Sequence, residues 1–234
     1  MFSIRLADHS FCIENRYSYV EELCRDYVMP GTDGERISVS DEEMARESIP
    51  GEDYPPSYEE STALYRKFCE LLIPDEIFMF HASAVSIDGR GLLFAATSGT
   101  GKSTHAGLWK DVFGERAVII NDDKPLVRVG MDEIMVYGTP WSGKHSLQTN
   151  TTAPVKALFL LERGDKNSVE PVTFREAYPT VLNQAYRPKD PVLMQKTLGM
   201  VNQFLKSVPV YRLKCNISKE AVWTAYSVLE DMEN

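Results

Sequence analysis

The sequence contains few cysteines and no long apolar run, and each absence excludes a class of protein. Its 234 residues include four cysteines, which are scattered and form no C-x-x-C pair. Neither a disulfide framework nor a zinc site is indicated, so we expect reduced thiols in a cytoplasmic protein. No stretch approaches the roughly 18 apolar residues of a membrane span, and the N-terminus lacks the apolar core of a signal peptide. We therefore expect no membrane partner.

Basic residues are outnumbered, which argues against nucleic acid as a partner. There are 25 Lys and Arg against 34 Asp and Glu, giving a formal net charge of −9. Nonspecific binding to a phosphate backbone needs clustered basic side chains, so we exclude nucleic acid. The acidity is concentrated in the first third: 17 acidic and 7 basic residues occur up to Asp75, and 17 acidic and 18 basic from Glu76 onward. We interpret the acidic third as a surface for a basic partner or peptide.

Length and composition predict one substantial domain with a small accessory lobe. Hydrophobic residues make up 43% and charged residues 25%, as in ordinary globular proteins. Residues 41–56 are acidic and contain three prolines and a glycine, which favours a loop between lobes. Ser57 and Glu60 form an S-x-x-E capping box, so a helix is predicted to begin at Ser57 and to connect the lobes. The predicted boundaries are 1–56 for the acidic lobe and 57–234 for the main domain.

The main domain combines short apolar strands with amphipathic helices. Strands are predicted over 77–87, 91–96, 117–120, 125–129, 134–137, 155–161 and 210–213, and helices over 102–113, 173–185, 190–207 and 219–231. Several strand pairs are joined by connections too short for a crossover, such as the Asp88-Gly89 turn. We predict an α/β fold of mixed α+β character, in which a mixed, partly antiparallel sheet carries a glycine-rich loop and flanking helices beside a small N-terminal α+β lobe.

The strongest motif is the stretch A-T-S-G-T-G-K-S-T over residues 96–104, which nearly matches the P-loop (Walker A) pattern G-x-x-x-x-G-K-[ST]. Ala96 replaces the first glycine, which is harmless wherever φ is negative. An apolar strand precedes the loop and an amphipathic helix follows it, whereas a glycine-rich turn with a chance lysine would not need that context. The residues predicted to hold the nucleotide phosphates are Ser98, Gly99, Thr100, Gly101, Lys102, Ser103 and Thr104.

Each residue type in this loop has a chemical reason. Gly99 and Gly101 allow the backbone N–H groups to turn toward a phosphate, at the positive end of the following helix. Lys102 supplies a mobile charge for the β and γ phosphates, and the Ser103 hydroxyl can bind Mg²⁺. The sequence thus predicts binding of ATP and Mg²⁺.

An acid pair and a histidine could supply the rest of a phosphoryl-transfer site. Asp122 and Asp123 end the strand after the P-loop helix, where one carboxylate could hold Mg²⁺ and the other accept a proton. The alternative is a pair of turn-forming aspartates, since N-D-D also suits a turn. His81 lies one hairpin before the loop and could tune the base. A lone strand histidine is otherwise a satisfied core residue.

The string from His81 to Asp123 resembles the catalytic domain of bacterial HPr kinase/phosphorylase. That family has a histidine before the hairpin, a loop of the form G-x-S-G-x-G-K-S and an Asp-Asp pair, in this order. The loop is also similar to that of ATP-dependent phosphoenolpyruvate carboxykinase, which shares the same P-loop fold. The resemblance implies that Asp122 is the base with His81 as its neighbour. The chemistry of the residues then predicts that Asp123 joins Ser103 at the metal and that Lys102 assists at the γ phosphate.

One segment departs from the HPr kinase pattern. Those kinases carry an E-[IV]-R-G signature, whereas this chain has V-Y-G-T-P-W-S-G-K-H over residues 136–145, with no glutamate at the matching place. This segment is more similar to small HPr-kinase-like proteins found beside modified-peptide genes, some of which phosphorylate serine on a precursor peptide. Lys144 could supply charge near the γ phosphate, or it could be a solvated loop lysine.

The sequence therefore predicts an ATP- and Mg²⁺-dependent serine kinase whose acceptor is a peptide or small protein. Two alternatives stay open: a kinase acting on a small molecule, and a module that binds nucleotide without transferring phosphate.

Overall fold

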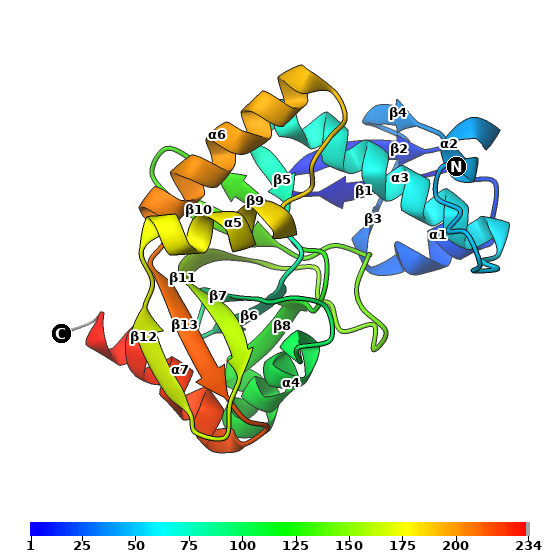
Figure 1. The fold of residues 1–234 in the computed structure, drawn as a ribbon. Helices are drawn as coiled ribbons and strands as arrows, with labels where there is room; N and C mark the ends of the chain where they lie inside the picture. Colours follow the sequence, from blue (N-terminus) through cyan, green and yellow to red (C-terminus); the bar gives the residue numbers. More distant parts are fainter. Residues whose placement is uncertain (233–234) are drawn as a thin grey trace. The chain divides into compact units, whose positions relative to one another are not determined.

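A computed structural model describes residues 1–232 of the chain (Figure 1). The chain forms two compact units, Met1–Leu72 and a larger one that begins at Ile73. We describe each unit by itself.

The first unit is a four-stranded sheet with helices. Its elements are β1 (Phe2–Leu6), β2 (His9–Ile13), α1 (Ser18–Leu23), a 3-10 turn (Arg25–Tyr27), β3 (Val28–Met29), β4 (Glu35–Ile37), α2 (Asp41–Ala45) and α3 (Pro56–Leu72). The strand order is β3-β1-β2-β4, with β4 parallel to β2 and the other pairs antiparallel. The rings of Phe11 on β2 and Phe68 on α3 lie 4.9 Å apart, which fixes α3 on the sheet.

The unit boundary falls after Leu72 and not after residue 56, so α3 belongs to the first unit. The predicted capping box at its start is wrong, because Ser57 lies inside α3 and Glu60 has other partners. The buried Glu60 carboxylate accepts hydrogen bonds from the backbone N–H groups of Arg16, at 2.5 Å, and Tyr17, at 3.0 Å. Glu60 thereby fixes α3 to the segment before α1. This is a long-range contact that no local sequence motif predicts.

Part of the predicted acidic loop is a helix. The Ser40 hydroxyl accepts from the Glu43 N–H, and the Glu43 carboxylate accepts from the Ser40 N–H, so a complete capping box starts α2. Three acidic residues in the first turn of α2 also stabilise the helix, because their negative charge lies at the positive end of its dipole.

The second unit is built on a nine-stranded sheet. Its strands are β5 (Ile77–Met79), β6 (Ser83–Ile87), β7 (Arg90–Ala95), β8 (Ala117–Asn121), β9 (Leu126–Val129), β10 (Ile134–Tyr137), β11 (Thr152–Arg163), β12 (Ser168–Pro171) and β13 (Val210–Cys215). Its helices are α4 (Lys102–Phe113), α5 (Phe174–Gln184), α6 (Pro191–Ser207) and α7 (Lys219–Asp231), with 3-10 turns at Ile73–Asp75 and Gly114–Arg116.

The topology confirms the predicted mixed sheet. The strand order is β5-β9-β10-β11-β7-β6-β8, with β13 also pairing β11 and β12 pairing β13. β11 is parallel to β7 and β13, whereas the β6–β7, β9–β10 and β10–β11 pairs are antiparallel. The predicted 77–87 strand is two strands, because residues 80–82 leave the β5–β9 ladder before β6 begins. β12 was not predicted.

Helices cover both faces of this sheet (Figure 1). Leu93 and Ala95 of β7 lie in one core with α5 and α6, and Leu92 and Phe94 lie in a second core with α4 and α7. This strand is buried on both faces, as its continuous apolar run predicts. Within residues 1–232, no helix combines the length and apolar character needed to cross a membrane.

Candidate phosphate-binding and catalytic site

The candidate site lies along one edge of the second unit's sheet. β7 and β8 both run antiparallel to β6, so they are parallel to each other, and β11 and β13 share their direction. Four strands therefore end at the same edge, which is where open α/β sheets bind ligands. β8 leads into the acid pair, β7 into the P-loop, and β11 and β13 end at Arg163 and Cys215.

The predicted P-loop occupies residues 96–101, and the structure confirms the strand before it (β7) and the helix after it (α4). Its positive φ angles are confined to Gly99, at 79°, and Gly101, at 115°, so Ala96 needs no glycine-like backbone. A Cβ on either glycine would meet nothing within 4 Å, which means that backbone conformation and not crowding demands glycine there. The space around these two residues is open for a phosphate.

Lys102 is the first residue of α4, and its side chain is directed back onto the loop. Its Nζ donates a hydrogen bond to the carbonyl oxygen of Ala96 at 3.2 Å, and the residue is buried. Burial lowers the pKa of Lys102, an effect that the charge of Asp123 opposes. The loop thus holds a partly desolvated ammonium beside its own backbone.

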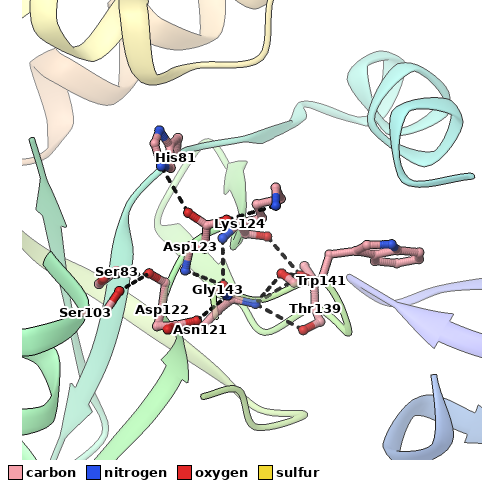
Figure 2. Close-up of polar contacts among 10 residues, drawn as sticks. All are labelled: His81, Ser83, Ser103, Asn121, Asp122, Asp123, Lys124, Thr139, Trp141 and Gly143. Carbon is pink, nitrogen blue, oxygen red and sulfur yellow. Dashed lines mark hydrogen bonds and ion pairs between the residues drawn. The ribbon is translucent and has the colours of Figure 1, made fainter. Parts of the chain in front are cut away.

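Two hydroxyl groups, one on β6 and one on the P-loop helix α4, contact the backbone of the acid pair. Ser83 at the start of β6 donates to the carbonyl oxygen of Asp122 at 2.8 Å, and Ser103 on α4 donates to the same oxygen at 3.4 Å (Figure 2). The tertiary structure therefore brings the predicted Mg²⁺ ligand Ser103 beside the aspartates. Ser83 was not among the predicted site residues, since nothing local distinguishes it from other strand serines.

The carboxyl group of Asp122 is covered by a loop. Its Oδ1 accepts a hydrogen bond from the Gly143 N–H at 2.6 Å, and its Oδ2 is buried with no hydrogen-bond partner among the described residues. A Cβ on Gly143 would lie 2.8 Å from Oδ2, so only glycine allows the loop to approach this closely. Burial raises the pKa of Asp122, and the Gly143 hydrogen bond only partly opposes that rise.

Asp123 has the opposite environment. Its Oδ1 lies 3.0 Å from His81 Nε2 and its Oδ2 lies 2.9 Å from Lys124 Nζ, and a quarter of its side chain is exposed (Figure 2). Burial alone would raise its pKa, but the His81 hydrogen bond and the Lys124 charge bring the pKa of Asp123 well below its usual range. His81 thus contacts Asp123, whereas the resemblance implies Asp122 as its neighbour.

Asn121 was not among the predicted site residues, yet its side chain holds this turn together. Its Oδ1 accepts hydrogen bonds from the N–H groups of Asp123, at 2.8 Å, and Lys124, at 2.7 Å. Its Nδ2 donates to the carbonyl oxygens of Thr139, at 3.1 Å, and Trp141, at 3.0 Å (Figure 2). The buried amide therefore ties the acid pair to the segment that carries Gly143. The N-D-D motif suggested a turn, but the distant partners could not be read from it.

The other predicted phosphate-binding residues lie at the surface. Ser98 and Thr104 are exposed on the loop and on the first turn of α4. Lys144 is exposed in the turn after Gly143, and within the described part of the chain no recorded polar contact joins it to the P-loop. Its contact with a γ phosphate stays a prediction.

Arg163, at the end of β11, supports the P-loop from the side opposite the acid pair. Its Nη2 donates to the carbonyl oxygen of Gly99 at 2.5 Å and its Nε to that of Thr100 at 3.2 Å. Both donors belong to one planar guanidinium, so the two carbonyls are held in a fixed relation. No sequence signal pointed to Arg163, because more than sixty residues separate it from the loop.

The second unit has one pocket beside the P-loop and another beside the acid pair. We call the first the loop pocket; it has a volume of about 670 Å³ and is lined by Gly99, Thr100, Gly101, Thr104, His105, Leu108, Leu161, Glu162, Arg163, Gly164, Asp165, Cys215, Asn216 and Ile217. We call the second the acid pocket; it has a volume of about 390 Å³ and is lined by Met79, His81, Asp123, Lys124, Asn183, Gln184, Ala185, Tyr186 and Arg187. One pocket adjoins the glycines, and the other contains the exposed half of the acid pair.

The side chains at this site fit Mg²⁺ better than they fit a metal ion whose ligands all come from the protein. Across residues 1–232 no group of three or more His, Cys, Asp or Glu side chains is arranged to hold a metal ion. Mg²⁺ takes few protein ligands and completes its shell with phosphate oxygens and water. The Ser103 hydroxyl and the ionised Asp123 carboxylate are donors of that kind.

Comparisons with known proteins identify no family. No protein-family model matches the chain, and no curated protein matches it. Among solved structures, the HPr(Ser) kinase/phosphatase from Coxiella burnetii matches with a TM-score of 0.40 and 11% sequence identity, over 67% of this chain and 99% of that chain. A likeness of this size establishes neither membership of a family nor an activity.

Proposed function

We propose that this protein is a kinase that transfers the γ-phosphoryl group of ATP to the serine hydroxyl of a peptide or small protein. The proposal rests on one observation above all: the P-loop lies at the same sheet edge as two adjacent carboxyl groups whose pKa values are displaced in opposite directions. Oppositely tuned carboxyls at one site divide into a proton acceptor and a permanently charged group.

The opposite pKa shifts support a separate role for each aspartate. Asp123 stays ionised because His81 and Lys124 stabilise its charge, which suits a ligand for Mg²⁺ together with Ser103. Asp122 has a raised pKa and an unpartnered oxygen, which suits a general base. His81 acts through Asp123 in this arrangement, as a group that keeps the metal ligand charged and oriented.

The proposed reaction balances as an in-line displacement. The acceptor oxygen forms a bond to the γ phosphorus, the bond from that phosphorus to the β–γ bridging oxygen breaks, and ADP leaves. The hydroxyl proton passes to Asp122, whose Oδ2 must first be uncovered by a displacement of Gly143. Lys102 and the loop N–H groups stabilise the charge on the transferred group, and bound Mg²⁺ would neutralise part of the charge on the phosphates.

The two pockets support an orientation for the two substrates. The loop pocket adjoins Gly99, Gly101 and the first turns of α4, and Leu108 and Leu161 give it apolar walls, which suits a nucleoside. The acid pocket contains His81 and Asp123, which suits the acceptor. ATP would then lie along the sheet edge with its γ phosphate toward the acid pair.

Nucleotide binding provides the first test. We expect Mg²⁺–ATP to bind the protein by calorimetry, and Lys102→Ala to weaken that binding at least tenfold, about 1.4 kcal/mol. Lys110→Ala is the matched control, because Lys110 is an exposed lysine in the last turn of the same helix. Equal binding by both variants, or no ATP binding by the unmodified protein, would reject the proposal.

Phosphoryl transfer provides the second test, and it separates the proposal from its two alternatives. The protein is incubated with γ-labelled ATP and the products of the genes that neighbour its own. A labelled peptide supports the proposal, a labelled metabolite supports a small-molecule kinase, and bound but unconsumed ATP supports a nucleotide-binding module. Asp122→Asn must bind ATP normally and lose transfer; a variant that keeps full transfer contradicts the assignment of the base.

A further inference from the structure

The acid pocket contains an arginine that the proposed reaction does not use. Arg187 follows α5 and lines the pocket together with His81, Asp123 and Lys124. Three of these four ionisable side chains are basic and one is acidic. Because Asp123 is already in contact with His81 and Lys124, the charge of Arg187 is not needed to neutralise it.

The chain segment that leads to Arg187 is held firmly against β5 and the residues after it. Phe80 and Ala185 form an antiparallel bridge. The His81 N–H donates to the Gln184 carbonyl oxygen at 2.8 Å, and the Tyr186 N–H donates to the Met79 carbonyl oxygen at 2.9 Å. These backbone bonds fix the position of this wall of the pocket relative to the imidazole of His81.

Among the described residues, Arg187 lacks the carboxylate partners that Arg116 and Arg212 of this unit have. Arg116 makes two hydrogen bonds to Asp88, and Arg212 contacts both Glu162 and Glu170. Arg187 is exposed, and within residues 1–232 its only recorded side-chain partner is Asn183 Oδ1, at a long 3.4 Å. A guanidinium presents a fork of donors that matches a carboxylate or phosphate, and here that fork has no anionic partner.

We propose that the acid pocket binds a serine peptide with an acidic side chain next to the acceptor residue, and that Arg187 binds the acidic group. The proposal rests on the kinase function proposed above and adds the charge of the acceptor. The serine hydroxyl would lie at the Asp123 end of the pocket and the carboxylate at the Arg187 end.

The test uses three fluorescein-labelled hexapeptides with blocked ends, each with a single serine flanked by two aspartates, two alanines or two lysines. Binding is measured by anisotropy with the full-length protein loaded with Mg²⁺ and a non-hydrolysable ATP analogue. We expect the aspartate peptide to bind at least threefold more tightly than the alanine peptide, and the lysine peptide most weakly. The preference should fall as salt is added, since the contact is partly exposed.

Three variants test whether Arg187 causes the preference for the aspartate peptide. Arg187→Ala should abolish it, and Arg187→Glu should reverse it in favour of the lysine peptide. Arg175→Ala should leave it unchanged, because Arg175 is exposed on α5 and lies outside the lining of the pocket. N-acetyl-serine added as a competitor distinguishes a small hydroxy acid from a peptide: we expect it to displace the aspartate peptide poorly.

The outcomes are decisive. A preference that Arg187→Glu reverses supports the inference. Absence of binding, absence of preference, a preference that survives Arg187→Ala, or efficient displacement by N-acetyl-serine overturns it. Failure of this inference is distinguishable from failure of the kinase function, because the latter is judged by Lys102-dependent ATP binding and Asp122-dependent transfer, and neither involves Arg187.

Discussion

The loop pocket and the acid pocket differ in how their charged side chains are held. In the loop pocket, Arg163 donates to backbone carbonyls of the P-loop, and Glu162 is paired with Arg212. In the acid pocket, His81 and Lys124 both contact Asp123, and Arg187 has no acidic partner among the described residues. The first arrangement holds the backbone of the P-loop in place, whereas the second lowers the pKa of Asp123 and leaves Arg187 available to the proposed acidic group.

The largest expected effect is on the rate of transfer. Asp122→Asn should lower kcat by about 10² to 10⁴, because it removes a general base while its Oδ1 still accepts from the Gly143 N–H. ATP affinity should stay within about twofold of its original value, because the P-loop is untouched. Steady-state kinetics with the labelled acceptor measure the first quantity and calorimetry the second. Asp132→Asn, an exposed aspartate outside both pockets, is the control and should change neither.

The contact between Gly143 and Asp122 can be disrupted by a single substitution. Gly143→Ala places a Cβ 2.8 Å from Asp122 Oδ2, so the loop or the carboxylate must shift and the Gly143 hydrogen bond weakens. We expect a loss of about 1–3 kcal/mol in the free energy of unfolding, measured by urea denaturation. Gly107→Ala on α4 is the control: its Cβ meets nothing within 4 Å, so stability should rise by about 0.5–1 kcal/mol. A neutral Gly143→Ala would mean that this loop is not held against Asp122.

The opposite tuning of the two aspartates predicts opposite effects on stability. Asp122 has a raised pKa in the folded protein, so its contribution is lost as pH rises through that pKa, and Asp122→Asn should stabilise the protein at pH 7. Asp123 has a lowered pKa, so its contribution is present at pH 7 and is lost as pH falls, and Asp123→Asn should destabilise the protein there.

Thermal unfolding at pH 7 and at pH 4 tests this pair of variants. The Asp122→Asn difference should shrink at pH 4, because acid protonates that carboxyl in both states. The Asp123→Asn difference should largely persist at pH 4 and disappear only at lower pH, because its lowered pKa keeps the folded-state carboxyl ionised. Two shifts of the same sign at pH 7 would contradict the tuning and, with it, the assignment of base and metal ligand.

The smallest expected effect concerns the loop pocket. Arg163→Lys keeps the charge but cannot hold both the Gly99 and Thr100 carbonyls, so the P-loop is less well ordered. We expect the KM for ATP to rise about three- to tenfold with kcat changed less than twofold. A fall in kcat without a change in KM would show that Arg163 acts on the transferred phosphate and not on the shape of the loop.

The sequence by itself determined the features that lie within one continuous stretch. Residues 90–113 contain the strand, the loop and the helix of the P-loop in order, and the two glycines that need positive φ are local requirements. The Asp88-Gly89 turn is equally local, and both residues have positive φ as the dipeptide predicts. The short connections between several predicted strands were sufficient to predict a mixed sheet, because a parallel pair needs a longer crossover connection.

Only the tertiary structure decided how these pieces share a site. Asn121 finds its partners at Thr139 and Trp141, Asp122 meets Gly143, and Arg163 reaches the P-loop, contacts that span 18 to 64 residues of chain. The same long-range packing gives Asp122 and Asp123 opposite pKa shifts, although they are identical residues next to each other in the sequence. Side-chain type and spacing specify what a residue can do, whereas burial and distant partners set its charge, and these follow only from the fold.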